Sequence, residues 1–437
     1  MPRVALHTLG CKLNYAETAS LTRQFLDRGF ELVEFGQPAD VCLINTCTVT
    51  RRADSECRQM IRRALRTSPH PFVIVTGCYA QLEPEEVASI AGVDVVLGAR
   101  EKFELFTHVR DFTKGAAPRV LVSDIDTVDS FGAAASAEGA DRTRAFLKVQ
   151  DGCDYTCSFC TIPLARGASR SQSIEACLSQ ARDIIGQGYK EIVLTGVNVG
   201  DYGHAAGGGL PDLLRVLAGV EGLERIRISS VEPNLFTEEL LELAASNPKI
   251  CRHFHIPLQS GDDEMLRRMR RRYTALDYAR LVGRIRRVLP DCGIGVDVIV
   301  GFPGETRQHF ERTHEFLRDL DVSYLHVFTY SERPDTPAAA MAGQVPVQDR
   351  QERNRMLRIL GQKKRLAFYQ GLVGSTLEVL TEGTVEEGLR YGLTSNYARV
   401  GIPAEGVGEN VLLPVTILST DGDLCRGRPA GRSSGEG

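Results

Sequence analysis

The sequence predicts an α/β protein built from three parts in chain order: a doubly wound parallel sheet, a partial (β/α)6 barrel and a small antiparallel β-barrel. Three observations predict this arrangement. Short apolar runs alternate with helical stretches through the first 110 residues, a second series of strand–helix units starts near residue 142, and closely spaced short strands replace the helices after residue 371. The 437 residues are enough for each part to bury its own core.

The amino-terminal part, residues 1–110, has four apolar runs typical of buried parallel strands. The runs are RVALHT (3–8), DVCLI (40–44), FVIVT (72–76) and VDVVL (93–97). Helical patterns are expected near 15–28, 52–67, 83–89 and 101–107. The alternation favours a parallel sheet covered by helices. Residues 111–141 lose the apolar periodicity and are rich in small and acidic residues, so we expect a linker there.

The central part, residues 142–371, repeats the strand–helix unit six times. The expected strands are FLKVQ from 146, EIVLTG from 191, RIRISS from 225, RHFHIP from 252, GVDVIVG from 295 and YLHVFTY from 324. The helices between them are expected near 173–186, 211–219, 237–246, 263–288 and 305–319, and a helix over 347–370 closes the region. Six such units predict a parallel barrel that is three quarters complete, with reactive groups at the carboxyl ends of its strands.

The carboxyl-terminal part, residues 372–437, contains the alternating runs TLEVLTE, LRYGLT, YARVGIP and VLLPVTILS. Their spacing predicts a small antiparallel barrel of the oligonucleotide-binding kind. This part has nine acidic residues and five arginines, whereas RNA-binding surfaces are normally basic. Any RNA contact here would depend on a local set, Arg390, Tyr391, Asn396, Tyr397 and Arg399. The last dozen residues, RGRPAGRSSGEG, are expected to be disordered.

Charge and hydropathy place the chain among ordinary globular proteins. The net charge of −4 gives no general argument for nucleic acid, because phosphate binding requires local positive potential. Two runs provide it: six arginines lie between Arg51 and Arg66, and nine lie between Asp262 and Pro290. Both runs are candidates for phosphate contacts and equally for solvated helix faces. MPRVALHTLGCKLN has no signal-peptide pattern and no apolar run has membrane length, so we expect a cytoplasmic protein.

Twelve cysteines in such a chain are expected to be ligands or buried thiols rather than disulfides. Cys153, Cys157 and Cys160 form C-x3-C-x2-C, with Phe159 just before the last. A short loop of this spacing can hold an iron–sulfur cube by three corners and leave the fourth iron without a protein ligand. Zinc is the alternative, but it usually takes four protein ligands in paired groups, and no fourth partner follows here. The spacing therefore favours the cluster.

Three other cysteines each follow a predicted amino-terminal strand: Cys11 in TLGCKLN, Cys47 in NTCTVT and Cys78 in TGCYA. Because the carboxyl ends of parallel strands meet at one edge of a sheet, these thiols are expected to lie together. Three thiolates there suit a second iron–sulfur cluster. Cys42 lies inside an apolar run and is expected to be a buried thiol. No role is assigned to Cys57, Cys177, Cys251, Cys292 and Cys425.

The segment FLKVQDGCDYTCSFCTIPLARGASR resembles the cluster motif of radical S-adenosylmethionine (SAM) enzymes, and within it VQDGC...C..C.IP.ARG resembles their methylthiotransferase branch. TLGCKLN, NTCTVT and TGCYAQ resemble the three signature loops of that family's amino-terminal domain, and the last strands resemble its TRAM domain. The resemblance implies two 4Fe-4S clusters: one on the C-x3-C-x2-C cysteines, which cleaves SAM, and an auxiliary one on the three amino-terminal loop cysteines.

The ends of the later barrel strands carry groups suited to a nucleoside cofactor. A glycine at 196 permits close backbone approach, and an asparagine at 198 can bond an amino or carboxylate group. Each group alone is equally typical of a loop or a helix cap, so the inference rests on their shared rim. The resemblance to SAM-binding motifs implies a cofactor-binding set of Phe159, Gly196, Asn198, Ser230, Glu232, His255, Gln259 and Gly301. Arg166 and Arg333 match further family positions, without an assigned role.

Within the family, TLGCKLN, NTCTVT and YGLTSNYARV look closest to the branch that modifies N6-threonylcarbamoyladenosine beside the tRNA anticodon. The resemblance implies conversion of this nucleoside to its 2-methylthio form, with sulfur from the auxiliary cluster and a methyl group from a second SAM. Isopentenyladenosine in tRNA and a ribosomal-protein aspartate are alternative substrates. A non-catalytic iron–sulfur or zinc RNA-binding protein is the alternative of another class. The expected partners are the tRNA anticodon loop and an electron donor such as flavodoxin or ferredoxin, with a monomeric enzyme and no membrane.

Overall fold

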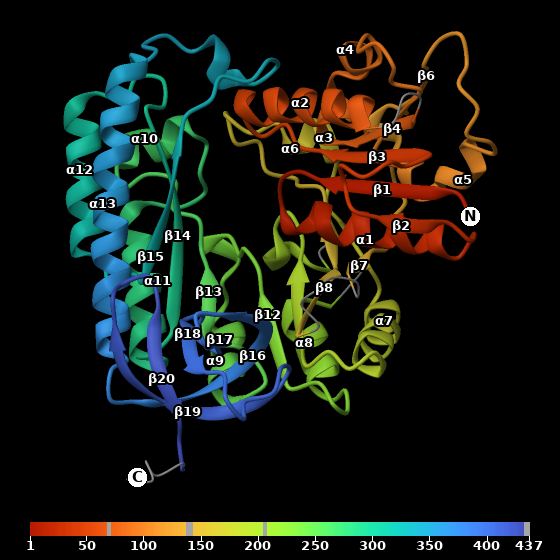
Figure 1. Cartoon of the computed structure of the whole chain (residues 1–437). Helices are drawn as coiled ribbons and strands as arrows, with labels where there is room; N and C mark the ends of the chain where they lie inside the picture. The colour runs from red at the N-terminus through yellow and green to blue at the C-terminus, as the bar shows by residue number, and fades with distance from the viewer. Residues whose placement is uncertain (68–70, 137–142, 204–207, 432–437) are drawn as a thin grey trace.

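The computed structural model describes residues 1–67, 71–136, 143–203 and 208–431. Figure 1 shows the amino-terminal sheet beside the first half of the central strands, with the carboxyl-terminal barrel packed at the far end of the central part. Among the residues described, no helix is long and apolar enough to cross a membrane.

The amino-terminal part contains a six-stranded parallel sheet in the order β2-β1-β3-β4-β5-β6. Its strands are β1 (Arg3–Thr8), β2 (Glu31–Val33), β3 (Val41–Thr46), β4 (Phe72–Gly77), β5 (Val95–Leu97) and β6 (Arg119–Leu121). Its helices are α1 (Lys12–Leu26), α2 (Arg51–Thr67), α3 (Cys78–Leu82), α4 (Pro84–Ala88) and α5 (Leu105–His108). Successive side chains of β3 alternate, so that Cys42 and Ile44 enter one core while Val41 and Leu43 enter another. The sheet is therefore covered on both faces, as a doubly wound fold requires.

The edge strands β2 and β6 were not predicted from the sequence. Each is three residues long and mostly exposed, so neither has the apolar run of a buried strand. β6 lies in the segment expected to be a linker. Its backbone pairs with β5, with Arg119 opposite Val95. β7 (Ala135–Ser136), from the same segment, pairs antiparallel with the first barrel strand. The rest of the expected linker, residues 137–141, lies outside the described part of the chain.

The central part has the six predicted strands, all parallel to their neighbours. They are β8 (Arg144–Lys148), β11 (Glu191–Thr195), β12 (Arg225–Ile228), β13 (His253–His255), β14 (Gly293–Val300) and β15 (Tyr324–Thr329). Two bridges, Ile226–Ile250 and Ser230–His255, join β12 to the β13 side, so the two sheets form one open barrel. The surrounding helices are α7 (Ile174–Gly186), α8 (Leu210–Ala218), α9 (Glu238–Ser246), α11 (Ala275–Val288), α12 (Arg307–Asp319) and α13 (Val347–Gly371).

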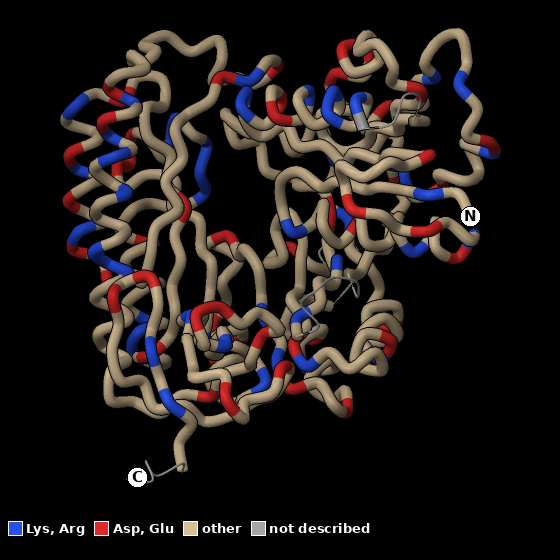
Figure 2. Tube along the Cα trace, in the orientation of Figure 1, with Lys and Arg blue, Asp and Glu red and all other residues tan. Residues whose placement is uncertain are grey.

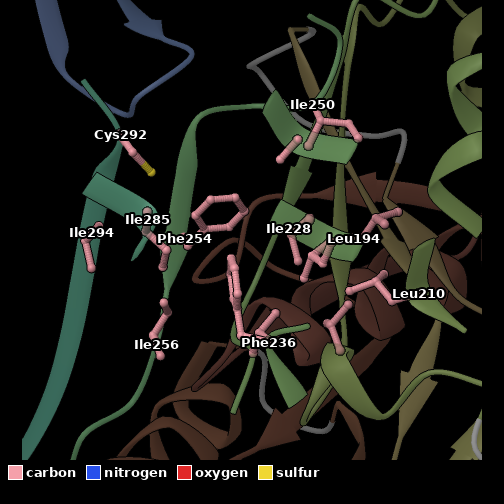
Figure 3. Close-up of a cluster of buried hydrophobic side chains, with 14 of the residues drawn as sticks. Leu194, Leu210, Ile228, Phe236, Ile250, Phe254, Ile256, Ile285, Cys292 and Ile294 are labelled. Carbon is pink, nitrogen blue, oxygen red and sulfur yellow. The ribbon is translucent and has the colours of Figure 1, made fainter. Parts of the chain in front are cut away.

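The main core of the central part lies between its strands and helices. Figure 3 shows Phe254 of β13 beside Phe236, and their rings make an edge-to-face contact with centroids 4.8 Å apart. On the same strand, His253 and His255 point the other way and line a cavity inside the barrel. The period of two along a strand thus separates an apolar face toward the helices from a polar face toward the barrel interior.

The carboxyl-terminal part is a closed barrel in the order β16-β17-β18-β20-β19. Its strands are β16 (Thr376–Glu386), β17 (Leu389–Thr394), β18 (Arg399–Pro403), β19 (Leu412–Thr420) and β20 (Cys425–Pro429). The expectation of a disordered tail was wrong for β20, which pairs with both β18 and β19. Only Cys425 and Gly427 of this strand are buried, so its sequence has no apolar run. The end of the expected tail, residues 432–437, lies outside the described residues.

Candidate active site at the junction of the three parts

The C-x3-C-x2-C loop leaves the barrel after β9 (Gln150–Asp151) and ends at α6 (Ile162–Arg166). Gly152 has φ +71°, and a β-carbon on it would lie 1.9 Å from the carbonyl oxygen of Ala168. This turn therefore requires glycine. Backbone N–H groups donate to two thiols, from Tyr155 to Cys153 Sγ and from Ile162 to Cys160 Sγ, both at 3.4 Å. The loop is thus folded around its sulfur atoms.

Arg271 is a residue of this site that the sequence did not identify. Its Nη1 lies 3.0 Å from Cys157 Sγ, and its Nη2 donates to the carboxylate of Glu232. Burial raises the pKa of Cys157, and the guanidinium of Arg271 opposes that shift. Burial also raises the pKa of Cys153 to about 11 and that of Cys160 to about 12. Metal ions bind thiolates, so a bound cation is what would keep these three sulfurs deprotonated at neutral pH.

The arginine run from 267 to 287 starts inside α10 (Asp263–Arg268), and its members lie in different environments. Arg271 is buried at the cysteine loop, whereas Arg267 pairs with Glu264 at 2.7 Å on the surface. Arg284 likewise pairs with Glu238 at 2.8 Å. In the other run, on α2, Arg58 pairs with Glu86 at 3.0 Å, and Figure 2 shows basic positions along that helix with acidic positions nearby. Paired surface arginines are less available for phosphate than their number suggests.

Cys11, Cys47 and Cys78 lie together at the carboxyl edge of the amino-terminal sheet. Burial, and then the neighbouring Cys78, raise the pKa of Cys47 to about 12. Gly10 has φ +99°, and a β-carbon there would lie 2.8 Å from Cys47 Sγ. Gly77 has φ +98° and is packed equally closely against Thr46. The two glycines thus let the loops approach closely enough to bring the thiols together.

A buried charge network connects the two cysteine sites. Arg166, in the helix that follows Cys160, lies with its Nη1 3.0 Å from Glu17 Oε1 and 2.9 Å from Asp151 Oδ1. Lys102 and Lys148 also contact Glu17, at 2.6 and 3.1 Å. Burial raises the pKa of Glu17, but these three cations lower it more, and the pKa lies well below its ordinary value. The network therefore contains three cations and two carboxylates, and it fastens α1 to the barrel.

Arg333, the second arginine identified from the sequence, joins the barrel to the amino-terminal part at a different place. Its Nη2 donates to Thr48 Oγ1 at 2.6 Å, and its Nη1 pairs with Asp54 at 2.5 Å. Thr48 is the residue after Cys47, so the loop after β15 holds one of the amino-terminal cysteine loops in place. A second contact from the same loop joins Arg51 to Glu332 at 3.3 Å.

The rim residues predicted to bind a cofactor include several unpaired groups. Asn198 Oδ1 and Gln259 Oε1 are buried and have no hydrogen-bond partner among the described residues, and the same holds for Oγ of Ser229, which was not in the predicted set. Buried polar atoms of this kind are rare unless a ligand or water pairs with them. Gly196 packs against Gln150, where a β-carbon would lie 2.8 Å from the amide oxygen. The rim therefore has two features of a binding site: a position where only glycine fits, and buried polar atoms without hydrogen-bond partners.

The other predicted rim residues contact one another. Ser230 Oγ lies 2.6 Å from His255 Nδ1, and His255 Nε2 lies 2.7 Å from Asp297 Oδ1. The ligand atoms of His255, Asp297 and His326 all lie within 4.8 Å of one another, which is a possible metal-binding arrangement. Because both ring nitrogens of His255 are already hydrogen-bonded, we interpret the set as a polar wall of the cavity. Glu232 is held by Arg271, as described above.

Phe159, within the cysteine loop, packs against the turn that contains Gly301. The ring of Phe159 meets that of Phe302 edge to face, with centroids 6.5 Å apart. Gly301 has φ +75°, and a β-carbon there would lie 2.3 Å from Arg350 Cγ. Its N–H donates to the carboxylate of Glu305, whose pKa is raised to about 7 by burial. The Gly-Phe-Pro-Gly segment is thus a turn held by hydrogen bonds to the buried side chain of Glu305.

A cavity of about 420 Å³ lies inside the barrel and is bordered by all three parts of the chain. Its walls include Cys11, Lys12, Gly196, Ser230, His253, His255, Tyr324, His326 and Tyr397. A second cavity, of about 800 Å³, shares Tyr324, His326 and Tyr397 with the first. It adds four arginines, namely Arg144, Arg358, Arg365 and Arg399. Glu382 and Asp423 pair with Arg144 and Arg365, which leaves Arg358 and Arg399 as its other two arginines. Two adjoining cavities, one with an aromatic wall and one with exposed arginines, suit a nucleotide attached to a longer nucleic-acid strand.

The carboxyl-terminal residues expected to meet RNA divide into two groups. Arg390 donates to backbone carbonyls at Val407 and Glu382, and Asn396 donates to Asp291, so both serve the structure. Tyr397 instead stacks on His253 with ring centroids 4.4 Å apart, and Arg399 borders the second cavity. The barrel thus contributes to the cavities in spite of its net acidity.

Two family models match the chain: Uncharacterized protein family UPF0004 over residues 3–98 and the Radical SAM superfamily over residues 147–317. The three-cysteine loop beside the first strand of an open parallel barrel agrees with the second match and defines the chain as a radical SAM protein. A Bacillus subtilis (strain 168) protein named threonylcarbamoyladenosine tRNA methylthiotransferase MtaB is 41% identical over 406 residues, 92% of this chain and 90% of the relative. This chain belongs to the methylthiotransferase family of radical SAM proteins.

Other relatives support this placement. An Aquifex aeolicus (strain VF5) protein of the same name is 41% identical over 410 residues, 93% of this chain and 98% of the relative. A tRNA-2-methylthio-N(6)-dimethylallyladenosine synthase of Jannaschia sp. (strain CCS1) is 34% identical, covering 87% of this chain and 83% of its own. Among solved structures, the radical SAM methyltransferase TsrM of Kitasatospora setae with cobalamin and a 4Fe-4S cluster bound shares the fold, with a TM-score of 0.58 and 19% identity over 77% of each chain.

Proposed function

We propose that this chain is a tRNA methylthiotransferase that converts N6-threonylcarbamoyladenosine beside the anticodon to its 2-methylthio derivative. The cavity inside the barrel is the observation that carries the proposal, because Cys11 of the amino-terminal cysteine site and rim residues proposed to bind SAM border the same space. A base held there would be within reach of both sites. The relatives named for this activity, similar along nearly the whole chain, support the choice of substrate.

The radical site is proposed to comprise a 4Fe-4S cluster on Cys153, Cys157 and Cys160, with SAM on the rim. When bound, this pair supplies a radical that activates an unreactive C–H position. Arg271 would hold Cys157 in place and offset its negative charge, since it donates to that sulfur at 3.0 Å. The unpaired oxygens of Asn198 and Gln259 suit the amino and hydroxyl groups of the cofactor.

The auxiliary site is proposed to comprise a second 4Fe-4S cluster on Cys11, Cys47 and Cys78. In this scheme its role is to supply the sulfur that becomes the methylthio group, while a second SAM provides the methyl. The protein contributes position: Gly10 and Gly77 allow the loops to close, and Arg166 fixes the helix that starts at Cys11 against the barrel. The cavity walls would shield part of the reacting base from water.

The tRNA is proposed to lie across the second cavity, where Arg358 and Arg399 are exposed beside Tyr397. Basic and aromatic side chains together suit phosphates and unstacked bases of an anticodon loop. We also propose a small redox protein of the flavodoxin or ferredoxin type as the electron donor, a monomeric enzyme and a cytoplasmic location, because tRNA substrates are found there.

Nucleoside mass spectrometry of total tRNA from cells with and without the gene tests this function. Loss of 2-methylthio-threonylcarbamoyladenosine, with accumulation of the unmodified nucleoside, is the expected result. Loss of the methylthio form of isopentenyladenosine instead would move the assignment to the alternative tRNA substrate. An unchanged tRNA profile would exclude tRNA and direct the search to ribosomal proteins.

A further inference from the structure

Lys12 follows Cys11 directly and is the only lysine or arginine among the described residues that border the 420 Å³ cavity. It is the first residue of α1, and its ammonium group lies close enough to His253 and His326 to affect both imidazoles. These two histidines belong to β13 and β15, on the far wall of the cavity. Lys12 therefore borders the cavity from the amino-terminal part, while the two histidines border it from the barrel.

No hydrogen bond or ion pair joins Lys12 to any residue in the described part of the chain, and the residue is exposed where it borders the cavity. Desolvation lowers the pKa of Lys12. Tyr397 opposes this shift, Arg227 and Arg144 add to it, and Glu191 opposes it. The first turn of α1 has no acidic residue and no side-chain cap, so no negative charge of that turn competes for Lys12. An anion bound in the cavity would give Lys12 a partner.

The opposite wall is aromatic. His253, Tyr397 and Tyr324 form a cluster of three rings: His253 stacks on Tyr397 with centroids 4.4 Å apart, and its Nε2 lies 2.7 Å from the phenol oxygen of Tyr324. Gly295 of β14 makes room for Tyr324, because a β-carbon there would lie 2.2 Å from the phenol oxygen. Burial lowers the pKa of His253 well below its ordinary value, so the ring is neutral at pH 7. A flat neutral wall suits a purine, with Lys12 free to contact its substituent.

We propose that Lys12 binds the carboxylate of the substrate's N6 side chain and thereby selects a nucleoside with an anionic substituent over one with an apolar substituent. The inference rests on the proposed function and adds a determinant of specificity to it. The two substrates named for the relatives differ in this respect, since a threonylcarbamoyl group carries a carboxylate and a dimethylallyl group carries no charge.

A backbone phosphate is the other anion that could meet Lys12. We favour the carboxylate because the adjoining cavity offers Arg358 and Arg399 for phosphates, beyond the ion-paired Arg144 and Arg365, whereas the first cavity has one cation and an aromatic wall. Lys12 is also next to Cys11, and the group that it binds must therefore be part of the nucleotide that enters the reaction site. The two sources make different predictions when the carboxylate is removed from the RNA.

The test uses the reconstituted enzyme and a synthetic anticodon stem-loop in two forms, one with the threonylcarbamoyl carboxylate and one with that carboxylate converted to its primary amide. We expect wild-type kcat/KM for methylthiolation to be roughly 10- to 100-fold higher with the carboxylate, the range for a hydrogen bond between charged groups. Lys12→Gln should remove this preference by lowering kcat/KM for the carboxylate form alone. Lys12→Arg should keep most of it, and Lys363→Gln, on the exposed face of α13, should match wild type.

Iron content and SAM cleavage without RNA are measured on every variant, because Lys12 adjoins a proposed cluster ligand. An equal loss of kcat/KM on both RNAs in Lys12→Gln would assign the residue to phosphate and overturn the proposal. Unchanged discrimination would overturn it as well. A wild-type enzyme that cleaves SAM but modifies neither RNA would instead refute the proposed function, which this design separates from failure of the Lys12 inference.

Discussion

Arg166 Nη1 lies 3.0 Å from Glu17 Oε1, and this buried ion pair joins the helix after the barrel cysteine loop to the helix that begins beside Cys11. Glu17 also accepts from Lys102 and Lys148, so a single carboxylate serves three cations. Buried charges are tolerated only when they are paired. The relative position of the two cysteine sites therefore depends on a residue that takes no part in the chemistry.

Glu17→Gln should reduce the free energy of unfolding by about 3 to 5 kcal/mol, because it leaves Arg166, Lys102 and Lys148 with Asp151 as their one remaining carboxylate in this network. Chemical denaturation of the reconstituted protein measures the change. Glu34→Gln, at an exposed position, is the matched control and should alter stability by no more than about 0.5 kcal/mol. Equal stability of the two variants would show that the network contributes nothing to the junction.

The cysteine loops and the buried network differ in how far they could be predicted. Each amino-terminal cysteine follows an apolar strand, and the topology of a parallel sheet then brings the three together. Glu17 meets Arg166 across 149 positions of sequence, and no local pattern marks such a pair. Arg271 could not be identified for a related reason, because it lies in a run of arginines of which most other members are exposed. Strands were missed where burial was slight, as in β2 and β20.

Arg271→Gln should lower the rate of SAM cleavage by roughly 10- to 100-fold, because it removes a charge-assisted hydrogen bond to Cys157 and leaves Glu232 without its cation. Arg271 acts through these partners, so the electron paramagnetic resonance spectrum of the reduced cluster should change as well. Arg271→Lys keeps the charge but cannot reach both partners with one planar fork, and intermediate activity is expected. An unaltered spectrum with normal SAM cleavage would show that Arg271 has no effect on the cluster and contributes only to packing.

The two cysteine sites should fail in different ways. Cys157→Ala should abolish formation of 5′-deoxyadenosine while leaving the iron of the auxiliary site, and Cys47→Ala should spare some cleavage but eliminate methylthiolation. Iron analysis and product assays on both variants make the distinction. Cys57→Ala is a demanding control, because Cys57 Sγ lies 3.3 Å from the carbonyl oxygen of Cys47 but is not a proposed ligand. Loss of the auxiliary iron in Cys57→Ala would require the ligand set to be revised.

Glu305 makes the stability of the Gly301 turn depend on pH. Burial raises the pKa of Glu305 to about 7 from an ordinary value near 4.5, so the folded protein favours the neutral acid. Its contribution to stability is fully present below pH 4.5 and is lost as the pH rises through 7, where ionisation of the buried group costs about 1 to 3 kcal/mol. Glu305→Gln cannot ionise and should therefore become more stable relative to wild type between pH 5 and pH 8. Thermal unfolding of both proteins across that range measures this difference in stability at each pH. Any part of the difference that does not vary with pH, such as the loss of the Arg353 contact, cancels when one pH is compared with another. A difference that does not vary with pH would show that Glu305 is already ionised in the folded protein, held by Arg353 and the N–H groups of Gly301 and Phe302.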